Sequence, residues 1–326
     1  MRRRDFATVV AWVVSWPLAA RAQQSTMPVI GFLNSQSPVT FGHLAEAFRQ
    51  GLQEAGFRDG RNVVIEYRWA EGKIDRLPEL AAELVRRGVS VLVATGGEPA
   101  GMAAKAATST LPVVFAIGGD PVKVGLVSSL NRPGGNMTGL TQFTEPLEAK
   151  RFSLLRELMP SATAIAALIN PRIPAADSQL SELRQAAATA GVRLVALTAT
   201  DESEFDAAFA ELARQHAEAL IVCSDPYFNS RRDRLVSLAA QHRMPAIYEF
   251  REFVAAGGLM SYGASLADGY RQVGVYTGRI LEGAEPAELP VLQPTRFELV
   301  IRLPTAEALE IELPPSLLAR ADEVIE

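Results

Sequence analysis

Short segments rich in glycine and hydroxyl side chains follow several apolar runs of this chain, and their chemistry suits the binding of a carboxylate. The clearest is Thr95-Gly96-Gly97, which ends the run at 90–95 and precedes a helical pattern. Glycines let a ligand approach the backbone, and the first turn of a helix offers N–H groups that have no acceptor within the helix. Asn34, Ser35 and Ser37 form the next such segment. These residue types are also ordinary caps and turn formers, so both interpretations stay open.

Acidic side chains at the predicted ends of strands could pair with the ammonium group of an amino acid. The candidates are Asp120, Asp225 and Glu249. Each could instead cap a helix or form a salt bridge at a hinge, and capping competes most strongly at Asp120 because Pro121 follows it. Asn170 ends a further predicted strand and adds a polar side chain to the same edge.

Tyrosines near the same strand ends could close over an apolar or aromatic part of a ligand by stacking. Tyr227, Tyr248 and Tyr262 have suitable positions, although ordinary packing between two lobes would explain each of them as well. Tyr262 is the strongest single expectation, because it lies where the chain is predicted to cross between two halves of the molecule. The full predicted ligand-binding set is Asn34, Ser35, Ser37, Thr95, Gly96, Gly97, Asp120, Asn170, Asp225, Tyr227, Tyr248 and Tyr262.

The sequence indicates no cofactor and no metal site. It contains no glycine-rich nucleotide motif after a strand and no H-E-x-x-H pattern, and the histidines fall inside helical patterns. The single cysteine, Cys223, ends an apolar strand, where a buried and unreactive thiol is the ordinary interpretation.

The elements that would position these residues occur twice in the chain. A strand at 62–67, a helical pattern and a strand at 90–95 are repeated by 192–197, a second helical pattern and 219–223, about 130 residues later. Apolar runs without polar alternation are typical of parallel strands covered by helices on both faces. Two similar lobes imply a cleft between them, in which a small ligand would bind.

We therefore expect an α/β protein with two doubly wound parallel-sheet lobes joined by a hinge of several strands. Lobe 1 is predicted to comprise residues 28–140 and 262–285, and lobe 2 residues 141–261 and 286–326. The matching passages near 137–141 and 258–262 are interpreted as strands that cross between the lobes.

Residues 1–22 have the pattern of a secretory signal peptide. A basic start precedes the apolar stretch Ala7–Leu18, and Ala20-Arg21-Ala22 fits a cleavage site after Ala22. Arg3-Arg4-x-Phe6 also resembles a twin-arginine signal, so the general and the twin-arginine export routes both remain open.

The composition is that of a soluble globular protein long enough for two domains. Hydrophobic residues make up 48% of the 326 positions and charged residues 21%, with a formal net charge of −5. An acidic balance argues against a nucleic-acid partner, because nucleic-acid binding leaves a basic patch. It still permits a small anionic ligand held by backbone N–H groups.

Several motifs resemble those of the substrate-binding proteins of ABC importers, in the subfamily that includes tryptophan- and phenylalanine-type amino-acid binders. The matching segments are 115–122, 132–139, 257–263 and 314–322. The resemblance implies a type I periplasmic-binding fold and delivery of a solute to an inner-membrane permease. From the signal peptide and the two predicted lobes we expect a periplasmic, non-catalytic mature chain that closes at its hinge on a small solute, such as an amino acid or related carboxylate. Because such a carrier must hinge and dock, we expect a monomer.

Two other functions remain open at this point. An exported sensing module would present its closed form to a membrane receptor rather than to a permease. A secreted hydrolase would use carboxylates at strand ends as an acid–base pair and would turn its ligand over, whereas a binding protein would release it unchanged.

Overall fold

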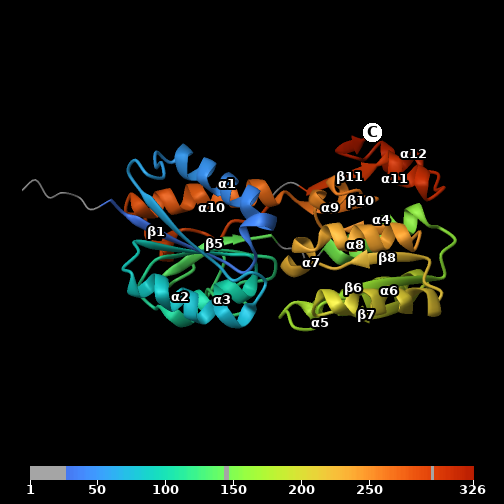
Figure 1. Ribbon diagram of the computed structural model, residues 1–326, viewed down its shortest axis with the longest axis horizontal. Helices are drawn as coiled ribbons and strands as arrows, with labels where there is room; N and C mark the ends of the chain where they lie inside the picture. The colour runs from blue at the N-terminus through green and yellow to red at the C-terminus, as the bar shows by residue number, and fades with distance from the viewer. Residues whose placement is uncertain (1–26, 143–146, 295–296) are drawn as a thin grey trace, which may run out of the picture.

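The computed structural model describes residues 27–142, 147–294 and 297–326. These residues form two lobes that lie next to each other along the long axis of the molecule (Figure 1). The predicted signal peptide, residues 1–22 with its cleavage site after Ala22, lies outside the described residues. Within the described part of the chain, no helix combines the length and the apolar character needed to cross a bilayer.

Lobe 1 is built on a five-stranded parallel sheet in the order β2-β1-β3-β4-β5. Helices cover both faces of this sheet (Figure 1). Its elements are β1 (Val29–Asn34), α1 (Pro38–Glu54), β2 (Val64–Trp69), α2 (Leu77–Arg86), β3 (Val91–Thr95), α3 (Glu98–Ala107), β4 (Val113–Ile117), β5 (Met137–Thr141) and, from much later in the chain, α10 (Leu266–Leu281).

Lobe 2 contains a seven-stranded sheet in the order β7-β6-β8-β9-β10-β11-β12, in which only the β10–β11 pair is antiparallel. Its strands are β6 (Ala164–Ile169), β7 (Arg193–Thr198), β8 (Ala219–Val222), β9 (Ala246–Tyr248), β10 (Met260–Ala264), β11 (Phe297–Arg302) and β12 (Glu323–Ile325). Its helices are α4 (Glu148–Leu158), α5 (Ala176–Ala190), α6 (Phe205–Arg214), α7 (Pro226–Ser230), α8 (Arg232–Gln241), α9 (Arg251–Ala255), α11 (Leu303–Ala308) and α12 (Pro315–Leu318).

The repeat expected from the sequence is present in the topology. The order of β1 to β5 in the first sheet is the same as the order of β6 to β10 in the second. In each lobe, one covering helix follows a strand of the other lobe. α10 comes after β10 of lobe 2 and packs on α1 of lobe 1, and α4 comes after β5 of lobe 1 and packs on α5 of lobe 2. The two lobes are therefore interleaved in sequence, and the chain passes between them more than once.

The lobe boundaries differ from the expected ones in two places. Residues 262–264, expected in lobe 1, belong to β10, which pairs with β9 and β11 inside the sheet of lobe 2. Residues 286–292, expected in lobe 2, lie against lobe 1, where Leu292 N donates to Gly139 O and Val291 N to Leu130 O. The strands 137–141 and 258–262 were interpreted as crossing strands, but β5 and β10 are integral strands of their own sheets. The passages between the lobes follow them.

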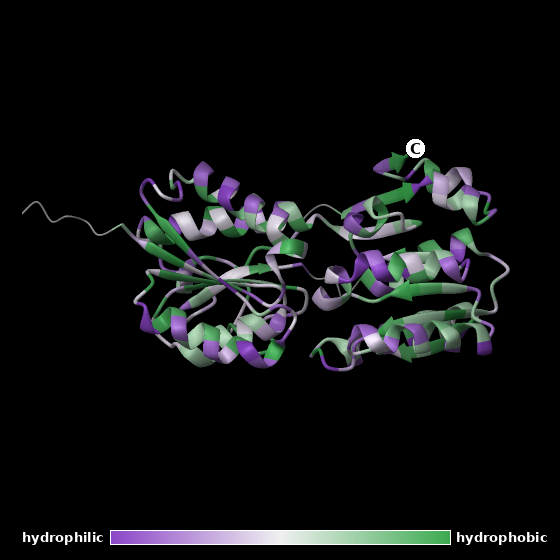
Figure 2. Ribbon diagram, in the orientation of Figure 1, coloured by the Kyte–Doolittle hydropathy of each residue, from purple (hydrophilic) through white to green (hydrophobic). Residues whose placement is uncertain are grey.

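The cores lie between each sheet and its helices. β1, β3, β4 and β6 are almost completely buried, as their uninterrupted apolar runs predict. Figure 2 shows hydrophobic residues along the strands, and hydrophilic residues gathered on the outer sides of helices such as α1 and α2. At one border of each sheet, β2 and β7 are only partly buried. Parallel sheets built in this way bring the carboxyl ends of their strands to one edge, where ligands bind in such folds.

Candidate functional site

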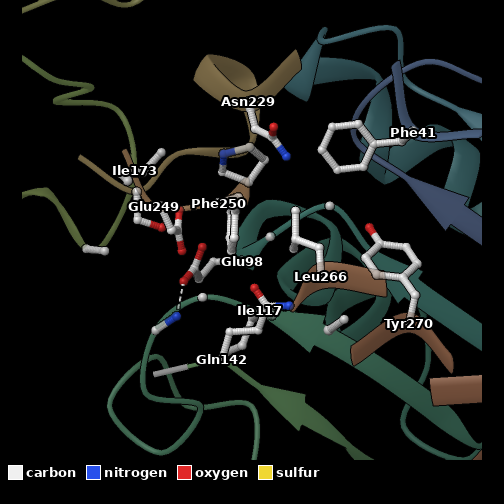
Figure 3. A pocket seen from close by; sticks show the side chains of 18 of the residues that line it. Phe41, Glu98, Ile117, Gln142, Ile173, Asn229, Glu249, Phe250, Leu266 and Tyr270 are labelled. Carbon is white, nitrogen blue, oxygen red and sulfur yellow. Dashed lines mark hydrogen bonds between the residues drawn. The ribbon is translucent and has the colours of Figure 1, made fainter. Parts of the chain in front are cut away.

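A cavity lies between the lobes at the carboxyl ends of both parallel sheets (Figure 3). The loops after β3 and β4, together with α1 and α10, form its lobe 1 side. The loops after β6, β8 and β9 and the start of α5 form its lobe 2 side.

One wall of the cavity is apolar and partly aromatic. It contains side chains from both lobes, and most of them are almost fully buried. Figure 3 shows the ring of Phe41 and the ring of Tyr270 on one side, with Phe250 on the other. These apolar lining residues are Phe41, Ile117, Ile173, Phe250, Leu266 and Tyr270.

The remaining wall is polar and rich in hydrogen-bond acceptors. Carboxylates come from both lobes, since Glu98 begins α3 and Glu249 follows β9; each is only 3% exposed. Glu98 Oε1 accepts a hydrogen bond of 2.6 Å from Gly119 N (Figure 3), which fixes the carboxylate beside the loop after β4. Side-chain amides complete this wall: Gln142, Gln179 and Asn229.

Glycines shape the lobe 1 floor of the cavity. Gly96 and Gly97 have φ values of +87° and +102°, in the region that favours glycine. A Cβ on Gly97 would lie 2.7 Å from Pro226 Cγ of the opposite lobe, and a Cβ on Gly96 would lie 2.5 Å from Ser35 Oγ. Gly97 is also the N-cap of α3 and offers no capping side chain, so the first turn of α3 has no side-chain acceptor at its N-cap. This loop therefore allows close approach of the other lobe, and the helix begins without a capping side chain.

Several predicted site residues form the support beneath this loop. Asn34 Nδ2 donates to Thr95 Oγ1 at 2.9 Å and to the Tyr270 hydroxyl at 3.3 Å. Ser35 Oγ donates to Gly96 O at 2.6 Å. Burial raises the pKa of Tyr270 to about 12, so its hydroxyl keeps its proton at neutral pH. Asn34, Ser35 and Thr95 thus have partners within lobe 1 and position the glycine loop from below.

Other predicted residues line an outer groove that adjoins the cavity. Ser35, Asn170, Asp225 and Tyr227 lie along this groove, and Gly96 lines both spaces. Asp225 caps α7, since its Oδ1 accepts from Phe228 N at 2.8 Å.

Asp225 is buried, and its hydrogen-bond partners lie within lobe 2. Its Oδ2 accepts from Asn170 Nδ2 at 2.9 Å. Burial raises the pKa of Asp225 to about 6, although these hydrogen bonds act in the opposite direction. The Tyr227 hydroxyl accepts from Glu202 N at 3.0 Å. Both side chains therefore already have partners in lobe 2.

The remaining predicted residues lie away from the cavity. Ser37 is the N-cap of α1 and accepts from Thr40 N. Asp120 caps its own turn through Val122 N at 2.8 Å.

Two of the predicted tyrosines pack inside lobe 2. Tyr248 stacks on Phe253 at a ring distance of 4.6 Å and does not line the cavity. Tyr262, the strongest expectation, lies in β10, and its ring is 6.3 Å from that of Phe297. It is an inner strand residue rather than part of a crossing, so it does not line the cavity.

Sequence reasoning missed most of the cavity wall. Glu98 follows Gly97 directly, so its position near a strand end could have identified it, and Glu249 is among the ammonium partners expected from the sequence. Phe41 and Tyr270 lie inside predicted helical patterns and Asn229 directly before one, where an apolar or polar residue signals nothing beyond packing or capping. Only the folded arrangement brings them to the cavity.

The structure has its cleft closed. Side chains from both lobes that line the cavity, such as Phe41 and Asn229, are 3% and 1% exposed. Pro226 of lobe 2 approaches Gly97 of lobe 1, and His43 Nε2 lies 3.9 Å from Glu252 Oε1 across the cleft. A solute in this cavity would contact both lobes at once.

Comparison with known proteins gives a consistent picture. Residues 40–325 match the family model described as ABC transporter substrate binding protein. A tyrosine-binding protein of Clostridioides difficile is 26% identical over 271 residues, which cover 82% of this chain and 76% of that protein.

Solved structures with similar sequences have the same architecture. The crystal structure of a domain from Streptococcus pneumoniae in complex with L-Trp is 27% identical, with a TM-score of 0.84, and the match covers 91% of this chain and 99% of that one. A conserved domain protein from Vibrio cholerae is 28% identical, with a TM-score of 0.85 and the same coverage. The two-lobed arrangement is the type I fold of periplasmic binding proteins, as expected. Because the family match spans most of its length, this chain belongs to the ABC transporter substrate-binding proteins.

Proposed function

We propose that this protein is an exported solute-binding protein of an ABC importer that binds an amino acid with a large apolar or aromatic side chain. The observation that carries the proposal is the cavity between the lobes, which has an apolar wall and an acceptor-rich wall built from both lobes. An amino acid has both characters at the two ends of one small molecule.

Each part of such a ligand has a complementary surface. The ammonium group suits the carboxylates of Glu98 and Glu249. The carboxylate suits the first-turn N–H groups of α3, whose N-cap Gly97 has no capping side chain. The side chain would lie against Phe41 and Phe250, which bury apolar area in an aromatic environment. Relatives that bind tryptophan and tyrosine support this choice of ligand class.

Binding would work by closure of the two lobes. A ligand that contacts both lobes favours the closed form, and the population shifts towards that form by as much as the ligand prefers it. The permease would then recognise the closed shape, and the solute would be released unchanged. The mature chain would act as a monomer in the periplasm.

Isothermal titration calorimetry with the twenty L-amino acids tests the ligand class. We expect saturable heat, with one site per chain, for large apolar or aromatic amino acids, and a negative heat-capacity change from apolar burial. If none of the amino acids gives saturable heat, the assignment is wrong, although the fold would stand.

A variant pair on α1 tests the location of the site. Phe41→Leu removes the aromatic ring from the cavity wall and should weaken binding about tenfold, within the range of 1–3 kcal/mol for changes in a hydrophobic pocket. Val39→Ala is the control, because Val39 is 91% exposed two positions earlier on the same helix. Equal affinities of the two variants would place the ligand elsewhere.

Export and transport need separate tests. Replacing Arg3 and Arg4 by lysine should reduce export if the twin-arginine route is used, and removing residues 1–22 should abolish export by either route. Uptake of the labelled amino acid that depends on this chain would support import. Ligand-dependent receptor signalling without uptake would instead support the sensing module.

A further inference from the structure

A second pocket lies within lobe 2, apart from the cavity between the lobes. It is formed by α8, β9, the loop before β10 and α11, all of which belong to lobe 2 (Figure 1). Among the described residues, those that line this pocket and those that line the cavity between the lobes form two separate sets. The pocket has a volume of about 100 Å³. A single water needs only roughly 10–15 Å³, and an apolar cavity of about 150 Å³ can bind benzene, so the pocket can hold a molecule of one small ring.

The walls of this pocket are largely apolar. Val236, Met244 and Leu259 line it, and all three are buried. Gly258 lets the loop before β10 lie against the ring of Tyr248, because a Cβ at this position would be 2.7 Å from Tyr248 Cε2. A surface of this kind favours the apolar body of a ligand, since contact with it removes apolar area from water.

The Tyr248 hydroxyl is the polar group that distinguishes this pocket. Tyr248 lines the pocket and is 1% exposed. Burial raises the pKa of Tyr248, and no hydrogen bond from a described residue contributes to that shift. Thr305, which also lines the pocket, has its hydroxyl occupied, because Oγ1 donates to Gly257 O at 2.9 Å. A buried tyrosine hydroxyl normally has a partner, so we expect the occupant of the pocket to supply an acceptor.

An ion pair at the edge of the pocket argues for an uncharged occupant. Arg243 lines the pocket after the end of α8, and its Nη2 lies 2.9 Å from Oε1 of Glu310, which follows the lining residue Leu309. Arg243 therefore already has a carboxylate partner, and an anion within the apolar walls would lose its hydration. Both side chains of the pair are largely exposed, and exposed ion pairs contribute little to stability, so the pair can open to admit a ligand.

We infer that this pocket of lobe 2 is a second ligand site, which takes a small uncharged molecule with an apolar body and one acceptor for the Tyr248 hydroxyl. The site goes beyond the proposed function, because the amino acid would bind between the lobes. The two sites are adjacent along the chain: Tyr248 ends β9 and directly precedes Glu249 and Phe250, which line the cavity between the lobes.

A nuclear magnetic resonance titration of methyl-labelled protein with three matched probes tests the inference. Cyclohexanone has an apolar ring and an acceptor, methylenecyclohexane keeps the shape without the acceptor, and cyclohexanecarboxylate adds a charge. We expect cyclohexanone to shift the methyl signals of Met244 and Leu259 saturably and to leave those of Ile117 and Leu266, in the cavity between the lobes, unchanged. Methylenecyclohexane should bind at least fivefold more weakly, because it leaves the hydroxyl unpaired. Cyclohexanecarboxylate should bind at least tenfold more weakly, because its charge must leave water.

The other outcomes overturn the inference in different ways. If cyclohexanone gives no saturable shift at Met244 and Leu259, or shifts only Ile117 and Leu266, the second site does not exist. A difference of less than fivefold between cyclohexanone and methylenecyclohexane would show that Tyr248 does not select the ligand. A carboxylate that binds within tenfold of cyclohexanone would contradict an uncharged ligand class. The amino-acid function stands or falls separately, by its own titration.

A pair of tyrosine variants tests the hydroxyl directly. Tyr248→Phe keeps the ring that stacks on Phe253 and should weaken cyclohexanone binding at least fivefold without lowering the Tm, since the lost hydroxyl has no partner in the described protein. Tyr276→Phe is the matched control. Its hydroxyl donates to Pro290 O at 2.9 Å and lies outside both pockets, so this variant should lose stability and bind cyclohexanone normally. A lower Tm for Tyr248→Phe, or a cyclohexanone affinity equal to that of the wild type, would contradict the inference.

Discussion

In lobe 1 the backbones of α1 and α10 are almost in contact, whereas in lobe 2 the corresponding helix α4 is held by a buried ion pair. Both helices occupy the same place in the repeat, since each follows the last repeated strand of the other lobe. The two lobes therefore attach their equivalent helices through different interactions.

In lobe 1 the close approach of α1 and α10 depends on glycine. A Cβ on Gly51 would overlap the carbonyl oxygen of Arg271, and one on Gly274 would overlap the carbonyl oxygen of Phe48. Without side chains at these positions the helix axes come close, and the surrounding apolar residues seal the interface.

In lobe 2 the attachment of α4 depends on a charged pair. Glu148 and Arg151 are both fully buried, and Arg151 Nη1 lies 2.7 Å from Glu148 Oε1. Arg151 Nε also donates to the carbonyl oxygen of Tyr262 in β10 at 2.8 Å, and Glu148 Oε1 accepts from Ser224 N at 3.3 Å. The ion pair thus connects β10, after which the chain passes to lobe 1, with the loop after β8, which lines the cavity. Close backbone packing attaches α10 to lobe 1, whereas the ion pair of α4 in lobe 2 also contacts β10 and the loop after β8.

The largest expected effect comes from breaking this ion pair. Arg151→Met leaves the Glu148 carboxylate buried without its arginine and should lower the free energy of unfolding by about 3–5 kcal/mol. Chemical denaturation measures the loss. The double change Glu148→Leu with Arg151→Met should recover most of it, because no charge remains buried. If the double variant is as unstable as the single one, the interaction of Arg151 with β10, rather than its charge pairing, holds the lobe.

The second comparison concerns the equivalent loops after β3 and β8. The first begins its helix with Gly97 and has no capping side chain, and the second begins α7 with the carboxylate of Asp225. Burial raises the pKa of Asp225 from 3.8 to about 6. Between these two values the folded protein keeps a proton that the unfolded chain has released, so this group makes stability fall as the pH rises through the window.

Asp225→Asn removes this pH dependence. Relative to wild type, the variant should gain up to about 3 kcal/mol of unfolding free energy between pH 4 and pH 7, with little further change above pH 7. Urea denaturation of both proteins across this range measures the difference, in which titration of the shared surface groups cancels. A constant difference would mean that the carboxylate titrates normally.

A matched pair of glycines on α1 tests the close contact in lobe 1. Gly51→Ala should cost about 2 kcal/mol, since its Cβ meets the backbone of Arg271 and the overpacking outweighs the gain in helix propensity. Gly42→Ala has no atom within 4 Å of its Cβ and should stabilise by about 0.5–1 kcal/mol. Thermal unfolding distinguishes them. Equal shifts for the two variants would show that the helices can separate without loss.

The smallest expected effect concerns the contact between the lobes. Gly97→Ala places a Cβ 2.7 Å from Pro226 Cγ and should weaken ligand binding about tenfold, or about 1.4 kcal/mol, by hindering closure. Gly283→Ala controls for backbone strain, because Gly283 has a φ of +103° and no atom within 4 Å of its Cβ. Calorimetry should find normal affinity in the control. An equal loss in both variants would point to strain rather than closure.

Much of the fold could be predicted because its signals are local. β3 and β8 were expected at 90–95 and 219–223 and run over Val91–Thr95 and Ala219–Val222, since a buried parallel strand is a continuous apolar run with polar residues at its end. The lobe boundaries near 262–264 and 286–292 were less accurate, because an apolar strand looks the same whichever sheet it joins.

The candidate site was predicted only in part. Gly96 and Gly97 were expected at the cavity and line it, whereas Tyr248 and Tyr262 pack elsewhere. A tyrosine at a strand end can turn towards the cleft or into its own lobe, and composition does not distinguish these cases.

The sequence by itself determined the alternation of strands and helices, the repeat and the glycine loop at a helix start, because these depend on neighbours along the chain. Only the tertiary structure decided that Glu98, Glu249 and Tyr270 share one cavity. Those residues come from distant parts of the chain and meet because the passages between the lobes bring α10 back onto lobe 1 and close lobe 2 over it. Contacts of that kind depend on topology and on lobe orientation, which no local pattern of residues specifies.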